Sequence, residues 1–101
     1  MAPSEHPAIR PPSTNAELYA LIERIAVDLG AAGDGDSARR LRVAVEGGST
    51  SGEIFTNLGV ELSRVERGVA VTDEALRELI TVALDTIDDA LRRVGQFPPP
   101  R

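Results

Sequence analysis

The chain has 101 residues, of which 42% are hydrophobic and 27% are charged, a balance that fits one globular domain and excludes wholesale disorder. Its formal net charge is −5, from 16 acidic and 11 basic residues, and every basic residue is an arginine. An acidic surface repels phosphate backbones and anionic lipids, so we expect no nucleic-acid partner and no membrane binding. The expected complement is a basic protein partner.

Groups that usually carry chemistry are scarce in this sequence. There is no cysteine, and the single histidine, His6, lies in a proline-rich segment without a serine or aspartate companion. Disulfides and cysteine metal sites are therefore excluded, and a catalytic triad is not indicated. The first residues lack the apolar stretch of a signal peptide, and no segment approaches the roughly 20 apolar residues of a membrane span. We expect a cytoplasmic protein with no cofactor and no enzymatic activity.

Prolines gather at the two ends of the chain. Because proline fixes φ and removes a backbone donor, residues 1–12 and 96–101 are predicted to be extended tails. Residues 13–95 are then predicted to be one all-α domain, a small bundle of about four amphipathic helices separated by glycine-rich breaks.

The first helix is predicted to begin at Thr14, whose hydroxyl can cap it while Glu17 reaches back in a capping box. Gly30 or Gly33 is expected to end it. Its apolar residues recur at helical spacing and form one stripe: Leu18, Leu21, Ile22, Ile25 and Leu29.

The second helix is the shortest and the third repeats the start of the first. Asp36 is the predicted cap of the second helix and Gly47 its end, and its stripe is Ala38, Leu41, Ala44 and Val45. Thr50 and Glu53 repeat the capping-box spacing at the start of the third helix. The stripe of the third helix is Ile54, Phe55, Leu58, Leu62, Val65 and Val69.

The fourth helix has the most regular pattern. Thr72 is its predicted cap, and Asp73 and Glu74 complement the positive end of the helix dipole. Its core-facing stripe is Leu76, Leu79, Ile80, Ala83, Leu84, Ile87, Leu91 and Val94. This assignment predicts that Leu84→Ala costs about 2 to 5 kcal/mol and that Asp85→Ala costs less than about 0.5 kcal/mol.

Asp85, Asp88 and Asp89 occupy the polar face of the fourth helix. Two carboxylates four residues apart could bind a divalent cation or work as an acid and base pair, but hard metals need more oxygen ligands and catalytic pairs need a cleft. Arg92 and Arg93 follow two of these aspartates by four residues and can pair with them. We therefore expect a solvated face, which is also a candidate surface for a basic partner.

The segment before the third helix is the weak candidate for an anion site. Free N–H groups at a helix start suit an anion, and the residues concerned are Gly48, Ser49, Thr50, Ser51 and Gly52. A phosphate-binding loop would follow a strand and end in Gly-Lys-Ser or Gly-Lys-Thr. Here the preceding segment is predicted to be helical and Glu53 would repel phosphate, so a helix end followed by a helix start is the preferred interpretation.

Each predicted helix carries one valine off its apolar stripe: Val27, Val43, Val60 and Val82. Single exposed apolar residues are normal, and scattered placement is the preferred interpretation. If the four valines were brought together, they would form a second apolar patch suited to a partner protein or to self-association.

Residues 47–55, together with Leu58 and Leu62, resemble a segment of small helical bacterial proteins of unknown function. The resemblance implies a bacterial helical domain, and no catalytic residues come with it.

The sequence as a whole leaves three hypotheses about function. The first is a protein-binding module, such as an immunity protein or antitoxin, that covers a basic partner. The second is a homodimeric structural or regulatory bundle, and the third is a ligand-binding or catalytic domain that uses the Gly-Ser-Thr loop.

Overall fold

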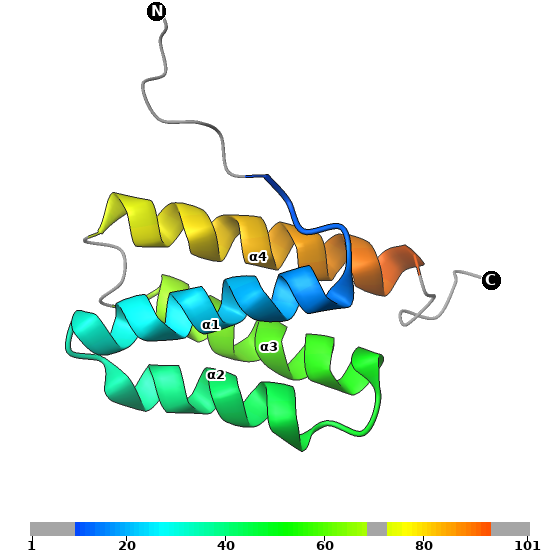
Figure 1. Cartoon of the computed structure of the whole chain (residues 1–101), viewed down its shortest axis with the longest axis horizontal. Helices are drawn as coiled ribbons and strands as arrows, with labels where there is room; N and C mark the ends of the chain where they lie inside the picture. Colours follow the sequence, from blue (N-terminus) through cyan, green and yellow to red (C-terminus); the bar gives the residue numbers. More distant parts are fainter. Residues whose placement is uncertain (1–9, 69–72, 94–101) are drawn as a thin grey trace, which may run out of the picture.

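Four antiparallel helices make up the structure of this protein (Figure 1), a computed structural model that describes residues 10–68 and 73–93. The helices are α1 (Asn15–Ala31), α2 (Gly35–Gly47), α3 (Ser51–Glu66) and α4 (Glu74–Arg93). Each helix runs opposite to the one before it, so α1 and α3 point the same way. Both α1 and α3 pack against α2 and α4. The predicted all-α bundle is confirmed, and most of both predicted tails lies outside the described residues.

The core is built almost entirely from aliphatic side chains. Among the described residues every buried side chain is hydrophobic, and Phe55 is the one aromatic side chain in this set. The predicted stripes supply most of the core. Four stripe residues are only partly buried at its edge, namely Leu21, Val45, Ile54 and Leu84. The predicted stripe positions Val69 and Val94 lie outside the described residues.

The position of Leu84 corrects one expectation. At about 100° per residue, Leu84 lies at one end of the apolar arc of α4, and it is only partly buried, at the margin of the core. Its truncation should therefore cost about 1 to 2 kcal/mol, less than the value expected for a fully buried leucine.

The predicted starts of α1 and α3 are confirmed. The hydroxyl of Thr14 accepts a hydrogen bond from the Glu17 N–H at 3.1 Å, and Thr50 makes the same bond at the start of α3. One detail differs from a capping box, because the Glu17 carboxylate accepts from the N–H of Ser13 at 2.8 Å, one residue before the cap. These hydrogen bonds lower the pKa of Glu17. The Glu53 carboxylate accepts from the N–H of Ser49 in the same way, so each carboxylate joins its helix to the residue before the cap.

The start of α2 differs from the prediction. Asp34 is the cap and accepts a hydrogen bond from the Ser37 N–H at 3.2 Å, whereas the predicted cap, Asp36, lies in the first turn. The cause is the tight turn that ends α1, in which Gly33 takes a φ of 94° that favours glycine. The Asp34 N–H then bonds to the Leu29 carbonyl at 2.8 Å, which fixes Asp34 where α2 begins.

The start of α4 is made by Asp73. Its carboxylate accepts a hydrogen bond from the Leu76 N–H at 3.2 Å, and its carbonyl accepts from the Arg77 N–H at 2.9 Å. These are the two bonds that a helix cap makes. The predicted cap, Thr72, lies outside the described residues, and the bonds of Asp73 place the cap one residue later than predicted.

Candidate interaction surfaces

The chain itself supplies hydrogen-bond partners at the candidate anion site. The Glu53 carboxylate accepts from the Ser49 N–H at 2.8 Å, and the Thr50 hydroxyl accepts from the Glu53 N–H at 3.1 Å. The Ser51 hydroxyl accepts from the Asn15 side-chain amide at 3.2 Å, which ties the start of α3 to the start of α1. An anion bound here would have to displace a carboxylate of like charge, so the segment is arranged as a helix cap.

The structure separates the four off-stripe valines into two classes. Val27, Val43 and Val60 are 53%, 59% and 56% exposed, while Val82 is half-buried on α4. Val43 and Val60 line one groove between α2 and α3. Neither Val27 nor Val82 lines it. The structure therefore brings together two of the four valines.

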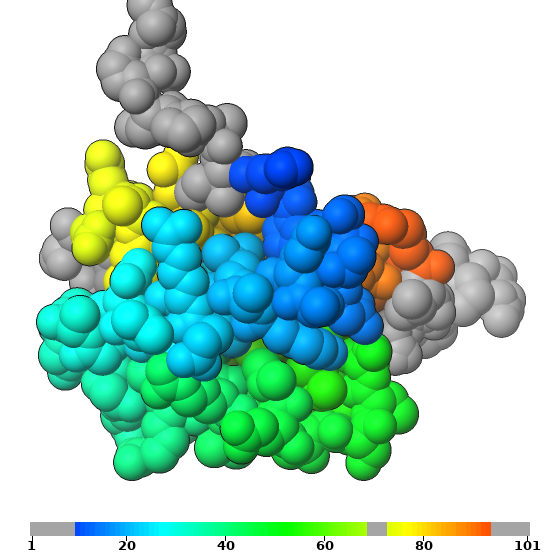
Figure 2. Space-filling model, viewed as in Figure 1, coloured from blue at the N-terminus to red at the C-terminus, as the bar shows by residue number. Residues whose placement is uncertain are grey.

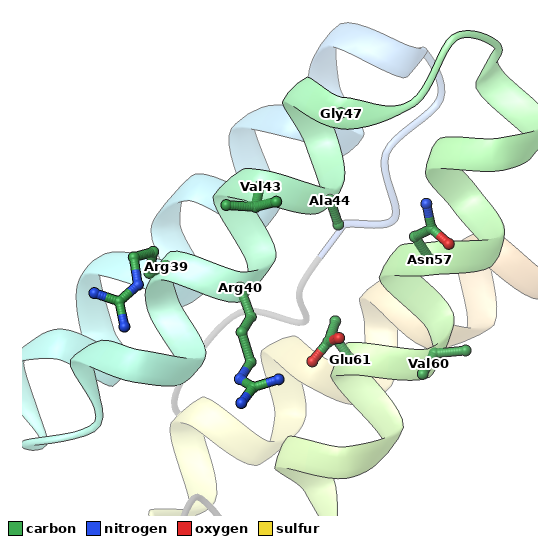
Figure 3. A pocket seen from close by; sticks show the side chains of 8 residues that line it. All are labelled: Arg39, Arg40, Val43, Ala44, Gly47, Asn57, Val60 and Glu61. Carbon is green, nitrogen blue, oxygen red and sulfur yellow. The ribbon is translucent and has the colours of Figure 1, made fainter.

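A groove lies between α2 and α3 (Figure 3). Its volume is about 490 Å³. Both helices contribute to its lining: Arg39, Arg40, Val43, Ala44, Gly47, Asn57, Val60 and Glu61. The small residues Ala44 and Gly47 leave room on the α2 side, since a Cβ added at Gly47 would meet nothing within 4 Å.

Charged groups stand at one end of this groove. One carboxylate oxygen of Glu61, Oε1, is buried without a hydrogen-bond partner among the described residues, although the side chain as a whole is 21% exposed. The nearest cation is Arg64 on the same helix, whose Nε lies 3.8 Å from it. Across the groove, Arg40 and Arg39 both pair with Asp36, at 3.2 and 2.6 Å, and their hydrogen bonds lower the pKa of Asp36.

Sequence reasoning did not single out Glu61, Asn57 or the two arginines as site residues. The available signal was weak, because each looks like an ordinary polar residue on a helix surface. Ala44 and Gly47, three residues apart, mark a thin side of α2, but only the packing of α3 beside it makes that side a groove.

The aspartates of α4 lie where the sequence predicted. Asp85, Asp88 and Asp89 are all exposed. Asp88 pairs with Arg92 at 2.9 Å, and Asp89 pairs with Arg93. The expected pairs across one helical turn are confirmed, so these two aspartates are largely neutralised and Asp85 is left as the uncompensated one.

Two glutamates extend the acidic surface along α4. Glu74, Glu78 and Asp85 are exposed and lie within about 40° of one another around the helix axis. No ion pair to any of them occurs within residues 10–68 and 73–93. We call these three residues the α4 acidic stripe. The spacing of four and then seven residues was the signal in the sequence that could have identified it.

One ion pair joins two helices directly. Arg42 on α2 donates to both carboxylate oxygens of Glu23 on α1, from Nε at 3.0 Å and from Nη2 at 2.7 Å. The two helices lie against each other along this face (Figure 2). The hydrogen bonds from Arg42 lower the pKa of Glu23, and the same contact raises the pKa of Arg42.

This pair predicts a pH dependence of stability. Because folding lowers the pKa of Glu23, its contribution is present above the unfolded-state pKa of 4.5 and is lost as the pH falls through the folded value. Glu23→Gln should therefore be less stable than the wild type at pH 7, and the difference should shrink below about pH 4.5. Urea denaturation at both pH values measures it. Glu78→Gln removes the same charge without breaking a described ion pair, and an equal pH dependence in that control would contradict the assignment.

The described residues also set bounds on metal and membrane sites. Within them, no group of three or more His, Cys, Asp or Glu side chains is placed to hold a metal ion. None of the helices among them combines the length and apolar character needed to cross a bilayer.

Comparison of the chain with protein-family models, with curated proteins and with solved structures finds no match. The resemblance of residues 47–55 to small helical bacterial proteins therefore stays a prediction.

Proposed function

We propose that this chain is a small acidic protein-interaction module that binds a basic protein partner through the α4 acidic stripe, in the manner of an immunity protein or antitoxin. The observation that carries the proposal is the set of three exposed carboxylates on α4 that have no ion pair in the described part of the chain. Residues 73–93 hold six acidic residues and three arginines, a net charge of −3. Residues 34–47 hold three of each and are neutral. Residues 15–31 and 51–66 carry a net charge of −2 each, so α4 together with its cap, Asp73, is the most negative of the four helices.

The shape of the stripe indicates what it would bind. Its carboxylates span 11 residues of α4, or roughly 16 Å at 1.5 Å per residue. A partner helix with arginine or lysine at matching intervals of four and seven residues could pair with all three. Uncompensated charge of one sign also speeds the encounter with an oppositely charged protein.

The proposal includes no enzymatic activity and no cofactor, and a bacterial, cytoplasmic setting is proposed with it. A homodimeric bundle is the second candidate function. It is favoured by a different observation, the groove between α2 and α3 with its two exposed valines.

A synthetic basic peptide can test the stripe. The probe is an amphipathic helix with arginines at positions i, i+4 and i+11, titrated into the full chain by calorimetry. Neutralising the stripe with Glu74→Gln, Glu78→Gln and Asp85→Asn should weaken binding by about tenfold, because each exposed charge pair contributes a few tenths to 1 kcal/mol. Higher salt should weaken the wild-type complex and leave the variant nearly unchanged.

The control removes three charges elsewhere, with Asp28→Asn, Glu46→Gln and Glu66→Gln. It has the same net charge as the stripe variant but retains the stripe, so its affinity should stay within about twofold of the wild type. Equal loss of affinity in both variants would mean that only net charge matters, and the proposed binding face would be wrong.

A further inference from the structure

The groove between α2 and α3 combines exposed apolar area with one carboxylate oxygen, Glu61 Oε1, that has no hydrogen-bond partner among the described residues. Val43 and Val60 face it from opposite sides and are 59% and 56% exposed. A lone exposed valine needs no explanation. Two of them across a hollow, with Ala44 beneath, form an apolar patch of the kind that marks an interface.

The charged groups of the groove lie on opposite sides of it at one end. Because α2 and α3 are antiparallel, Arg40 and Glu61 stand at the same level along the groove, and Gly47 and Asn57 stand toward its other end (Figure 3). Within one chain Arg40 pairs with Asp36 and not with Glu61. Glu61 Oε1 is left without a donor among the described residues, which is costly for a buried carboxylate oxygen.

Building on the second candidate function, the homodimer, we propose that this groove is its interface, in which a second copy of the chain packs on it about a two-fold axis parallel to α2 and α3. This rotation places α2 of each copy over α3 of the other, at the same level along the groove. Arg40 of one copy then stands over Glu61 of its partner, and Val43 over Val60. Every contact occurs twice, as an isologous interface requires.

Charge complementarity selects a second copy over another occupant. The α2 side of the groove carries Arg39 and Arg40, which share the single carboxylate of Asp36. The α3 side carries the partly exposed carboxylate of Glu61, whose only cation within 4 Å among the described residues is Arg64, at 3.8 Å. A face with cations on one side and an anion on the other complements itself under a two-fold rotation.

The rest of the surface supports the same choice. Residues 34–47 are neutral, whereas residues 73–93 carry a net charge of −3. Residues 51–66, on the other side of the groove, carry a net charge of −2. Contact through the groove therefore brings less like charge together than contact through α4. A chain of this size also buries only part of its surface on folding and gains from burying more in a dimer.

Sedimentation equilibrium of the full chain, from about 1 µM to about 1 mM, tests the dimer. The expected result is reversible association to twice the mass of the chain. Val60→Asp places a charge in the apolar centre and should weaken the dimer at least about tenfold. Val27→Asp introduces the same charge at an equally exposed valine outside the groove. The dissociation constant of its dimer should stay within about twofold of the wild-type value.

A charge swap tests the proposed two-fold arrangement itself. Arg40→Glu alone would set two acids against each other, and Glu61→Arg alone would set arginines against each other, so each variant should be monomeric where the wild type is dimeric. An equimolar mixture of the two should form a heterodimer, because both of its charge contacts are then opposite in sign. Circular dichroism identifies any charge variant that does not fold. In that case the comparison of Val60→Asp with Val27→Asp decides whether the groove is the interface.

Three results would overturn the proposal. These are a monomeric wild type up to about 1 mM, a Val60→Asp variant that dimerises like the wild type, and folded single variants whose mixture stays monomeric. The groove contains no residue of the α4 acidic stripe. Peptide binding to the stripe is therefore measured separately, and either proposal can fail while the other stands.

Discussion

Leu58→Ala is expected to lower the free energy of unfolding by about 2.5 to 5 kcal/mol. The side chain is 0% exposed at the middle of α3, so its removal leaves a cavity that the surrounding helices can fill only in part. Domains of this kind are stable by roughly 5 to 15 kcal/mol, and the loss would be a large fraction of the total. Urea denaturation measures this loss of stability. Wild type and variant are compared at the same protein concentration, because dimerisation makes the apparent stability depend on concentration.

Two substitutions on α4 serve as its controls. Leu84→Ala, at the margin of the core, should cost about 1 to 2 kcal/mol, and Asp85→Ala, on the solvent face, less than about 0.5 kcal/mol. Equal losses for Leu58→Ala and Leu84→Ala would show that the inner faces of these helices are wrongly assigned.

Gly48→Ala is expected to destabilise the protein by about 1 to 3 kcal/mol. Gly48 follows the last residue of α2 with a φ of −86°, which any residue can adopt, so the penalty does not come from the backbone. A Cβ at this position would lie 2.6 Å from Ile54 Cγ1 and 3.1 Å from the Ile54 backbone nitrogen. The start of α3 would have to move to accommodate it. The same urea titration measures the effect.

Gly30→Ala is the matched control for this substitution. Gly30 lies inside α1, and a Cβ there would meet nothing within 4 Å. Alanine favours the helix over glycine, so stability should rise by about 0.5 to 1 kcal/mol. If Gly48→Ala were also stabilising, the close approach of Gly48 to Ile54 would be disproved.

Local interactions explain how much of the fold could be predicted. The bonds of Thr14 and Thr50 to residues three positions later depend only on sequence spacing, and so does the ion pair of Asp88 with Arg92. Three details of the prediction were wrong: the caps of α2 and α4, each displaced by one or two residues, and the depth of Leu84 in the core. Asp36 lost the role of cap because the turn at Gly33 placed Asp34 there, and Leu84 moved to the edge because neighbouring helices define where the core ends.

The candidate surfaces divide in the same way. The α4 acidic stripe lies on a single helix, so helical periodicity alone predicts its alignment from the sequence. The groove requires α2 and α3 to lie side by side, because Val43 and Val60 belong to different helices and meet only through packing.

The sequence by itself determined four amphipathic helices and the starts of α1 and α3, because periodicity and caps act within one or two turns. The diagonal contacts between α1 and α3 needed the tertiary structure. Tyr19 and Phe55 place their ring centroids 6.3 Å apart, and Asn15 bonds to Ser51. The order of the helices around the core also decided which off-stripe valines share a groove, and it left Glu61 Oε1 without a donor within residues 10–68 and 73–93. These features depend on which faces meet, and single-helix periodicity does not specify that.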